Sequence, residues 1–257
     1  MVTVSDGARF EIGRVPQALF GVLGRNFVNF LGLSVVLVGA PSLINQLFTN
    51  YAHTNSSLAG LSWIVIMLTS IISLIFSFIL QAALVSGTIS DLNGRKLTIG
   101  EMIDGKATFA LPLLGLAILQ GLATGLGFIL LIVPGLIATC IWLVTVPALV
   151  VDRTGVMGAF GRSADLTRGH RWSMFAIVLV YFIITIIIGW VSLTLLGGVQ
   201  GAAASARLGV NPVVIGVNLV FNVLLGMISA TGVAVIYYEL RRVREGVAPQ
   251  ALVDTFS

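Results

Sequence analysis

Charge is what this sequence has least of. Asp, Glu, Lys and Arg make up only 9% of its 257 residues, against about a quarter in an average soluble domain. The charges leave long runs that contain none of these residues, at 27–50, 57–90, 107–151, 172–206 and 208–238. Each run can hold at least one helix of about 20 residues, the length that crosses a bilayer core. This composition excludes an ordinary soluble domain and predicts an integral membrane protein.

Cysteine and histidine are also scarce. Cys140 is the single cysteine, so neither an intramolecular disulfide nor a thiol cluster for a metal or redox centre can form. His53 and His170 lie far apart, and the acidic residue nearest to either, Asp165, belongs to a charged surface helix and is interpreted as solvated. The sequence also lacks a phosphate-binding loop, a nucleophile elbow and a zinc-protease motif. We therefore expect no enzyme activity, no metal and no cofactor.

The apolar runs are continuous rather than alternating, which favours helices over the strands of a membrane barrel. The run 107–151 would form one helix about 65 Å long at roughly 1.5 Å per residue, twice the bilayer core. Pro134-Gly135 is a strong turn signal, so we divide the run there. The fourth span that results is short and contains Pro147, which predicts that this span is kinked or tilted. The chain, 1–257, is then a single all-α membrane domain. Its six spans are expected at about 27–48, 58–84, 111–132, 136–150, 172–196 and 213–238, before a cytoplasmic tail at 241–257.

The loop charges give the orientation of these spans, because short cytoplasmic loops accumulate Lys and Arg. With six spans, Arg207 is the single basic residue on one side. The other side receives both termini, every acidic residue and 13 basic residues: Arg9, Arg14, Arg25, Arg95, Lys96, Lys106, Arg153, Arg162, Arg168, Arg171, Arg241, Arg242 and Arg244. An odd number of spans would scramble this partition. The sequence thus predicts both termini in the cytoplasm. Residues 1–14 lack the features of a signal peptide, so the first span is expected to stay in the mature protein.

A short amphipathic stretch precedes each odd-numbered span. The first begins near Pro16, a favoured first helical position, and the second begins with a capping box of Thr98 and Glu101. The third, 156–168, divides cleanly into an apolar and a charged half of the helical wheel. The three apolar faces are Val15, Ala18, Leu19, Val22 and Leu23; Ile99, Met102 and Ile103; and Val156, Met157, Ala159, Phe160, Ala164 and Leu166. The pattern predicts three interfacial helices on the cytoplasmic side.

The three stretches end alike, with Gly24, Gly105 or Gly169 followed by a basic residue and then an aromatic ring. The glycine suits a helix C-terminus, and the basic and aromatic residues suit the headgroup level of the bilayer. We interpret this likeness as three copies of one module, an interfacial helix followed by a two-span hairpin. The alternative is that any basic, aromatic-anchored entry into a membrane has this form.

Residues 98–175 resemble a bacterial inner-membrane superfamily. The resemblance is carried by Leu-Ile-Val-Pro-Gly-Leu at 131–136, Pro-Ala-Leu-Val-Val-Asp at 147–152, Gly-Val-Met-Gly-Ala at 155–159, Ser163, Leu166 and Arg-Gly-His-Arg-Trp at 168–172. That superfamily includes the YciC-like proteins and the membrane domain attached to some glycerophosphodiester phosphodiesterases. Its members are expected to have Glu where this chain has Asp152, a conservative departure. The resemblance implies a multi-pass module of the bacterial cytoplasmic membrane and no hydrolase, because that activity lies in a separate soluble domain that this sequence does not contain.

Ionisable residues inside a bilayer usually mark transport or proton relays, and none lies in the middle of a predicted span. Glu239, at the inner end of the sixth span, is interpreted as the ion-pair partner of a neighbouring arginine. The candidate intramembrane polar contacts are Gln120, Asn218 and Asn222; the two asparagines are four residues apart and share a helix face. Such amides either join neighbouring helices or contact a substrate or lipid.

The basic loops are expected to contact anionic lipid headgroups, each such residue contributing about 1 kcal/mol. The candidates are Arg25, Lys106, Arg162, Arg168 and Arg171. We expect no nucleic acid partner, because the aromatic residues and fold of a nucleic acid reader are missing; a membrane-protein partner is left open. The sequence therefore predicts a non-enzymatic membrane protein with a scaffolding, assembly or lipid-organising role. The alternative is a permease-like or lipid-handling transporter, since transporters often arise from repeats.

Overall fold

The computed structural model describes residues 13–54, 59–104, 106–195 and 212–245, and every element in these ranges is a helix. Six helices are long and apolar enough to span a membrane, which confirms the predicted all-α class and the number of such helices. The elements are α1 (Arg14–Ser34), the π-helix η1 (Val35–Gly39), α2 (Ala40–Thr54), α3 (Ala59–Leu92), α4 (Ile99–Ile103), the 3-10 helix η3 (Lys106–Phe109), α5 (Ala110–Leu130), α6 (Ile132–Ile141), α7 (Thr145–Val151), α8 (Gly155–Thr167), α9 (Arg171–Leu195) and α11 (Pro212–Glu245).

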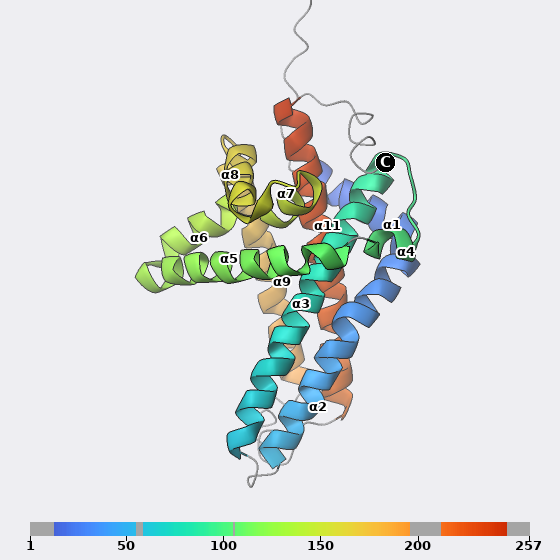
Figure 1. Cartoon of the computed structure of the whole chain (residues 1–257), viewed down its shortest axis with the longest axis vertical. Helices are drawn as coiled ribbons and strands as arrows, with labels where there is room; N and C mark the ends of the chain where they lie inside the picture. Colours follow the sequence, from blue (N-terminus) through green and yellow to red (C-terminus); the bar gives the residue numbers. More distant parts are fainter. Residues whose placement is uncertain (1–12, 55–58, 105, 196–211, 246–257) are drawn as a thin grey trace, which may run out of the picture.

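Three segments that pack against one another run along the long axis of the molecule: the continuous α1–η1–α2 segment, α3 and α11. α1, η1 and α2 follow one another without a gap, and α3 and α11 run beside them over much of their length (Figure 1). The predicted first interfacial helix and first span are therefore parts of one helix, which kinks at Asn26 (φ −122°, ψ 16°) rather than ending at Gly24. Gly39 lets α11 approach η1 closely, because a Cβ at this position would lie 3.2 Å from Cγ2 of Val223.

The turn between α5 and α6 is not where the sequence places it. Leu131 is extended and separates the two helices, whereas Pro134 is the third residue of α6. The prediction was wrong because a proline fits the first turn of a helix, where its missing N–H has no intrahelical acceptor to lose. Gly135 has a different role from the expected turn: a Cβ there would lie 2.5 Å from Cγ of Phe128, so glycine allows the two helices to meet.

The predicted fourth span is broken into two helices. α6 ends at Ile141, α7 begins at Thr145, and between them the backbone leaves the helical conformation at Trp142 (φ −103°, ψ 20°) and Val144 (φ −107°, ψ 23°). Pro147 is the third residue of α7, so the irregularity that it was expected to cause lies just before it. The break frees backbone carbonyls in an apolar region, and these need partners from elsewhere.

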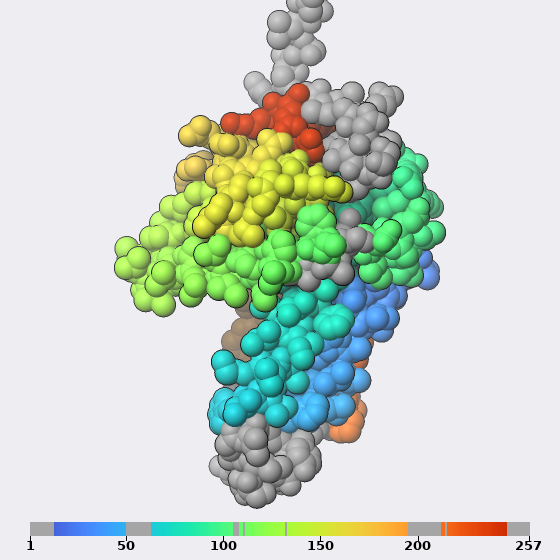
Figure 2. Space-filling model, viewed as in Figure 1, coloured from blue at the N-terminus to red at the C-terminus, as the bar shows by residue number. Residues whose placement is uncertain are grey.

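The α5–α6 hairpin does not follow the long axis. Figure 1 shows α5 crossing α3 and running across the direction of α2, α3 and α11, with α6 folding back beside it. Leu113 and Leu116 of α5 lie in one buried cluster with Val85 and Ile89, near the C-terminal end of α3. The rest of the hairpin extends sideways as an arm, which the space-filling view shows in green beside the bundle (Figure 2).

Burial is concentrated at one end of the long helices. In α3, nearly every residue from Leu80 to Asp91 is buried, whereas none from Trp63 to Ile79 is. α9 follows the same pattern, with Met174 fully buried and no buried residue between Leu179 and Val191. The buried end includes the C-terminus of α3 and that of α11, so the core sits where α4, α7 and α8 cover the bundle.

Candidate functional site: a charged collar and the pocket beside it

Asp152, directly after α7, joins three elements of the buried end. Its carboxylate accepts a hydrogen bond from Nε of Arg162 at 2.9 Å and one from the hydroxyl of Tyr237 at 2.8 Å. Arg241 completes the cluster with an ion pair at 3.2 Å. α7, α8 and the end of α11 are thereby fixed to one carboxylate, which is 11% exposed. The sequence placed Asp152 in the resemblance without giving it a role, because its partners are 10 to 89 residues away.

Glu245 extends this cluster beyond Asp152. It accepts hydrogen bonds from Arg162 and, at 2.8 Å, from Nε of Arg241. Burial alone would lower the pKa of Arg162, but the hydrogen bonds to Asp152 and Glu245 outweigh it and the pKa is raised. Arg162 is therefore a permanent cation whose donors are used inside the protein. The sequence proposed it as a headgroup contact; the structure places it between two carboxylates.

A second carboxylate, Asp91 at the end of α3, holds the kink of α1. Arg25 donates to it through two nitrogens at 3.0 and 2.6 Å, and Nδ2 of Asn26 donates at 2.8 Å. The Asp91 side chain is 3% exposed while that of Arg25 is 50% exposed. We call Arg25, Asp91, Asp152, Arg162, Arg241 and Glu245 the charged collar.

α8 and α4, two of the predicted interfacial helices, are attached to the core by polar as well as apolar groups. In α8 the buried residues are Ala159, Ser163, Leu166 and Thr167, and the Ser163 hydroxyl donates to the Ile141 carbonyl at 2.7 Å. In α4 the predicted capping box is confirmed, but of its three expected apolar residues only Met102 is buried. The predicted C-terminal glycine of α8 is also confirmed, since Gly169 has φ +89°. Gly105 lies outside the described residues.

The intramembrane polar candidates divide into two kinds. Gln120 joins α5 to the break before α7: its Nε2 donates to the Trp142 carbonyl at 3.2 Å, and its Oε1 accepts from Thr145 at 2.8 Å. Asn222 is exposed and donates to the Asn218 carbonyl of its own helix at 2.8 Å. A bridge that the sequence did not single out is the hydrogen bond from Thr69 of α3 to Asn45 of α2, at 2.9 Å.

Of the other proposed headgroup contacts, Arg25 belongs to the collar, and Arg168 and Arg171 lie outside it. Arg168 and Arg171 are exposed, and Arg168 accepts a hydrogen bond from Arg244 through its backbone carbonyl at 3.0 Å. The side chain of Lys106 lies outside the described residues. Glu239 forms the expected type of ion pair, with Arg242 at 3.0 Å. The ring that follows Arg171, Trp172, is 85% exposed, as suits an interfacial anchor.

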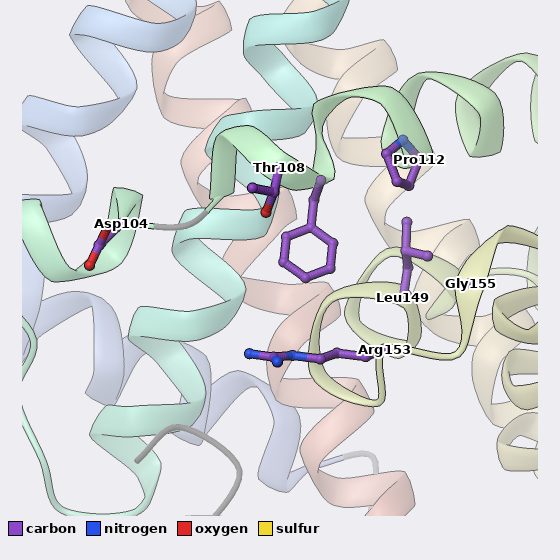
Figure 3. A pocket seen from close by; sticks show the side chains of 7 residues that line it. Asp104, Thr108, Pro112, Leu149, Arg153 and Gly155 are labelled. Carbon is purple, nitrogen blue, oxygen red and sulfur yellow. The ribbon is translucent and has the colours of Figure 1, made fainter.

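A cavity of about 340 Å³ lies beside the collar, where α4, η3, α5 and the α7–α8 loop meet. Its polar lining comprises Asp104, Thr108 and Arg153, and its apolar lining comprises Phe109, Pro112, Leu149 and Gly155. We call it the collar pocket (Figure 3). Arg153 has φ +49°, a left-handed conformation that costs a non-glycine residue about 1–2 kcal/mol. Asp152, the preceding residue, is held by its three partners, so the loop that presents Arg153 is fixed.

A second cavity of about 500 Å³ has an almost wholly apolar lining and lies between the α1–η1–α2 segment and α11. Leu31, Val35, Ala40, Leu219 and Val223 are among its lining residues. Neither cavity is lined by Gln120, Asn218 or Asn222. Among the described residues, no group of three or more His, Cys, Asp or Glu side chains is placed to hold a metal ion.

The fold and the collar define a polytopic helical membrane protein in which the ion pairs of the described residues are gathered at one end. The chain belongs to the family described as domain of unknown function DUF7847, whose model matches residues 97–240. This range contains the α5–α6 hairpin, the residues that line the collar pocket, and Asp152 with its partners Arg162 and Tyr237, while Arg241 lies one residue beyond it. Comparisons with curated proteins and with solved structures found no match. The resemblance of residues 98–175 to YciC-like and phosphodiesterase-linked membrane domains stays a prediction.

Proposed function

We propose that this chain is a non-enzymatic protein of the bacterial cytoplasmic membrane that organises lipid in the cytoplasmic leaflet. Both termini and the collar face the cytoplasm. α1–α2, α3, α9 and α11 cross the bilayer, and α4 and α8 lie at its inner surface. The observation that carries the proposal is the α5–α6 hairpin, an apolar arm that extends across the bundle at the level of its buried, charged end.

The contacts within the collar support this orientation. The charge rule assigns the entry to α1, the end of α3, the α7–α8 loop and the end of α11 to one side of the membrane. Asp91 joins the first two of these segments, and Asp152 joins the last two. Segments that the rule assigns to the same side are thus in direct contact.

The charge rule does not decide whether the hairpin crosses the bilayer. Its tip, 131–135, contains no charged residue, so 13 basic residues stand against one whether the tip lies outside or inside. Because α5 runs across the direction of the long helices, we favour the arrangement in which the tip stays on the cytoplasmic side and the hairpin lies in the plane of the membrane. An apolar helix in that position displaces lipid from one leaflet only, in the manner of interfacial helices.

The exposure of the hairpin also fits a lipid environment. Large apolar side chains point outward along α5, among them Leu111 and Ile129, at 79% and 81% exposure. Because α5 contacts the bundle mainly near its N-terminal end, most of its surface meets lipid chains. The transporter alternative has less support, because neither described cavity reaches the candidate polar residues Gln120, Asn218 and Asn222.

The proposal is tested with spin-labelled phospholipids in vesicles that contain the protein. One lipid carries its label near the headgroup and the other near the chain end. An in-plane hairpin should give a larger immobilised fraction for the first label, and equal fractions would overturn the lipid-organising function. Release of entrapped solutes at rates above those of protein-free vesicles would favour the transporter.

A matched pair of variants links this signal to the hairpin. Leu122→Gln with Ile129→Gln alters two exposed positions of α5, and Met67→Gln with Ile71→Gln alters two exposed positions of α3. The first pair should reduce the excess immobilisation near the headgroup. The second pair should leave that excess unchanged, since α3 meets lipid along the bilayer normal.

A further inference from the structure

The collar pocket combines opposite charges that do not neutralise each other. Within the described part of the chain, neither the Asp104 carboxylate nor the Arg153 guanidinium has a hydrogen bond or an ion pair. Figure 3 shows the Arg153 side chain extended toward the side on which Asp104 lies, with Leu149 and Pro112 on the other side. Other carboxylates of this end, Asp91 and Asp152, are each bound by arginine.

The contacts of the preceding residue fix the backbone at Arg153, and the Arg153 side chain is exposed. Asp152 is directed toward Arg162, Tyr237 and Arg241, whereas the side chain of Arg153, whose backbone is left-handed, lines the collar pocket. A guanidinium that is presented by a fixed loop and has no internal partner suits a phosphate, which it binds through parallel donors. The apolar lining by Phe109, Pro112 and Leu149 suits the carbon skeleton of the same ligand.

We propose that the collar pocket binds the headgroup of a zwitterionic phospholipid, with its phosphate on Arg153 and its ammonium group on Asp104. This inference rests on the proposed lipid-organising function and gives it a specific headgroup. The ligand needs an anion for Arg153 and a cation for Asp104, and phosphoethanolamine-type headgroups have both. The start of α5 lines the pocket, so a bound headgroup would leave its acyl chains beside the hairpin.

The test uses the full-length protein in neutral detergent and measures retained lipid by native mass spectrometry. Phosphatidylethanolamine is offered in competition with phosphatidylglycerol, which has the phosphate but no ammonium group. The wild type should prefer phosphatidylethanolamine. Arg153→Gln should weaken binding of both lipids roughly tenfold, the loss of a charge-assisted hydrogen bond, and Asp104→Asn should abolish the preference between them.

Two control variants remove the same charges outside the pocket. Lys96→Gln and Asp165→Asn alter exposed residues of the α3–α4 loop and of α8, and both should bind lipid as the wild type does. Equal effects of Arg153→Gln and Lys96→Gln would overturn the inference, as would an unchanged preference in Asp104→Asn. Arg153→Lys, which keeps the charge without the planar fork, should fall between wild type and Arg153→Gln if the variants are folded.

Soluble phosphoethanolamine separates a lipid from a free metabolite. Protection of the protein against thermal unfolding should require the acyl chains, so equal protection by soluble phosphoethanolamine would overturn the lipid assignment. The two proposals fail separately. Lipid retention that ignores Arg153 removes the pocket and leaves lipid organisation, whereas equal immobilisation of both spin labels removes lipid organisation and leaves the binding result.

Discussion

The two ends of the long helices are held together in different ways. At the collar end, α3 is buried on nearly all sides from Leu80 to Asp91, and its neighbours are joined by ion pairs to Asp91 and Asp152. At the opposite end, α3 and α9 expose large apolar side chains around most of their circumference, including Trp63 and Trp190. The collar end is packed like the core of a soluble domain, and the opposite end is built to meet lipid.

This difference indicates where the stability of the fold resides. Lipid chains are as apolar as leucine, so the outward halves of the helices gain little from packing against one another. At the collar, close packing and hydrogen bonding combine. Removing one charged side chain there leaves its partner unpaired in a buried site, and removing an apolar side chain leaves a cavity. Substitutions at the two ends should therefore have unequal effects.

The largest effect is expected from Asp152→Asn. The change removes the negative charge that Arg162, Arg241 and Tyr237 share, and loss of one partner from a largely buried ion-pair cluster costs about 3–5 kcal/mol. Thermal unfolding in nanodiscs, followed by tryptophan fluorescence, measures the loss. Asp165→Asn, at an exposed position of α8, should stay within about 0.5 kcal/mol of wild type; equal effects would mean that Asp152 has no special role.

The second largest effect is expected from adding one methyl group at each end of the long helices, by changing a glycine to alanine. In Gly87→Ala the new Cβ would lie 2.8 Å from Sδ of Met102 and 3.0 Å from Cε1 of Phe30, so overpacking should destabilise the protein by about 1–3 kcal/mol. Gly189→Ala on α9 meets nothing within 4 Å and should be neutral or stabilising by up to about 1 kcal/mol. The same unfolding assay compares them, and a neutral Gly87→Ala would contradict the tight packing of the collar end.

A smaller effect is expected at the break before α7. Gln120→Leu removes the donor to the Trp142 carbonyl and the acceptor for Thr145, and such interhelical bonds in membranes average about 0.6 kcal/mol. Asn222→Leu removes only a bond within its own helix and should change stability less. If Asn222→Leu has the larger effect in the same assay, Asn222 contributes more than its contacts account for.

The smallest effect concerns the cap of α4. The Thr98 backbone N–H, the Thr98 hydroxyl and Arg95 bind the Glu101 carboxylate and lower its pKa, which outweighs a small opposing effect of desolvation. A lowered pKa stabilises the folded cap above the ordinary glutamate pKa, and that contribution is lost as pH falls through the folded value. Protection of the α4 amides against hydrogen exchange, relative to Glu101→Gln, should therefore decline in acid. A difference that does not change with pH would mean that the capping box contributes nothing.

Much of the fold could be predicted from the sequence because it depends on local patterns. Uncharged runs of sufficient length located the six apolar helices, and the Thr98–Glu101 spacing located the cap of α4. Pro134-Gly135 was misread because the same dipeptide serves a tight turn or a helix start. The turn at Leu131 carries no residue that distinguishes it in the sequence.

The site was less predictable because its contacts join distant segments. Arg162 looked like a headgroup contact, since a sequence of one helix does not show that Asp152 and Glu245 meet it. The collar pocket likewise depends on bringing Asp104 beside the α7–α8 loop. The one local signal lies at Gly155, which itself has φ +71°, but nothing in the sequence identifies Arg153 as a second residue with positive φ.

The orientation of α5 tests the account most directly. Spin labels are placed singly at Leu111, Ile118, Leu122 and Ile129, exposed residues on one face of α5, in a Cys140→Ala background. Their immersion depth is measured from collisions with oxygen and with a water-soluble nickel chelate. Labels at Trp63, Met67, Ile71 and Leu74 of α3 should show a steady change of depth. The account predicts nearly constant depth along α5; a progressive change of about 27 Å from Leu111 to Ile129, the rise of 18 helical residues, would contradict it.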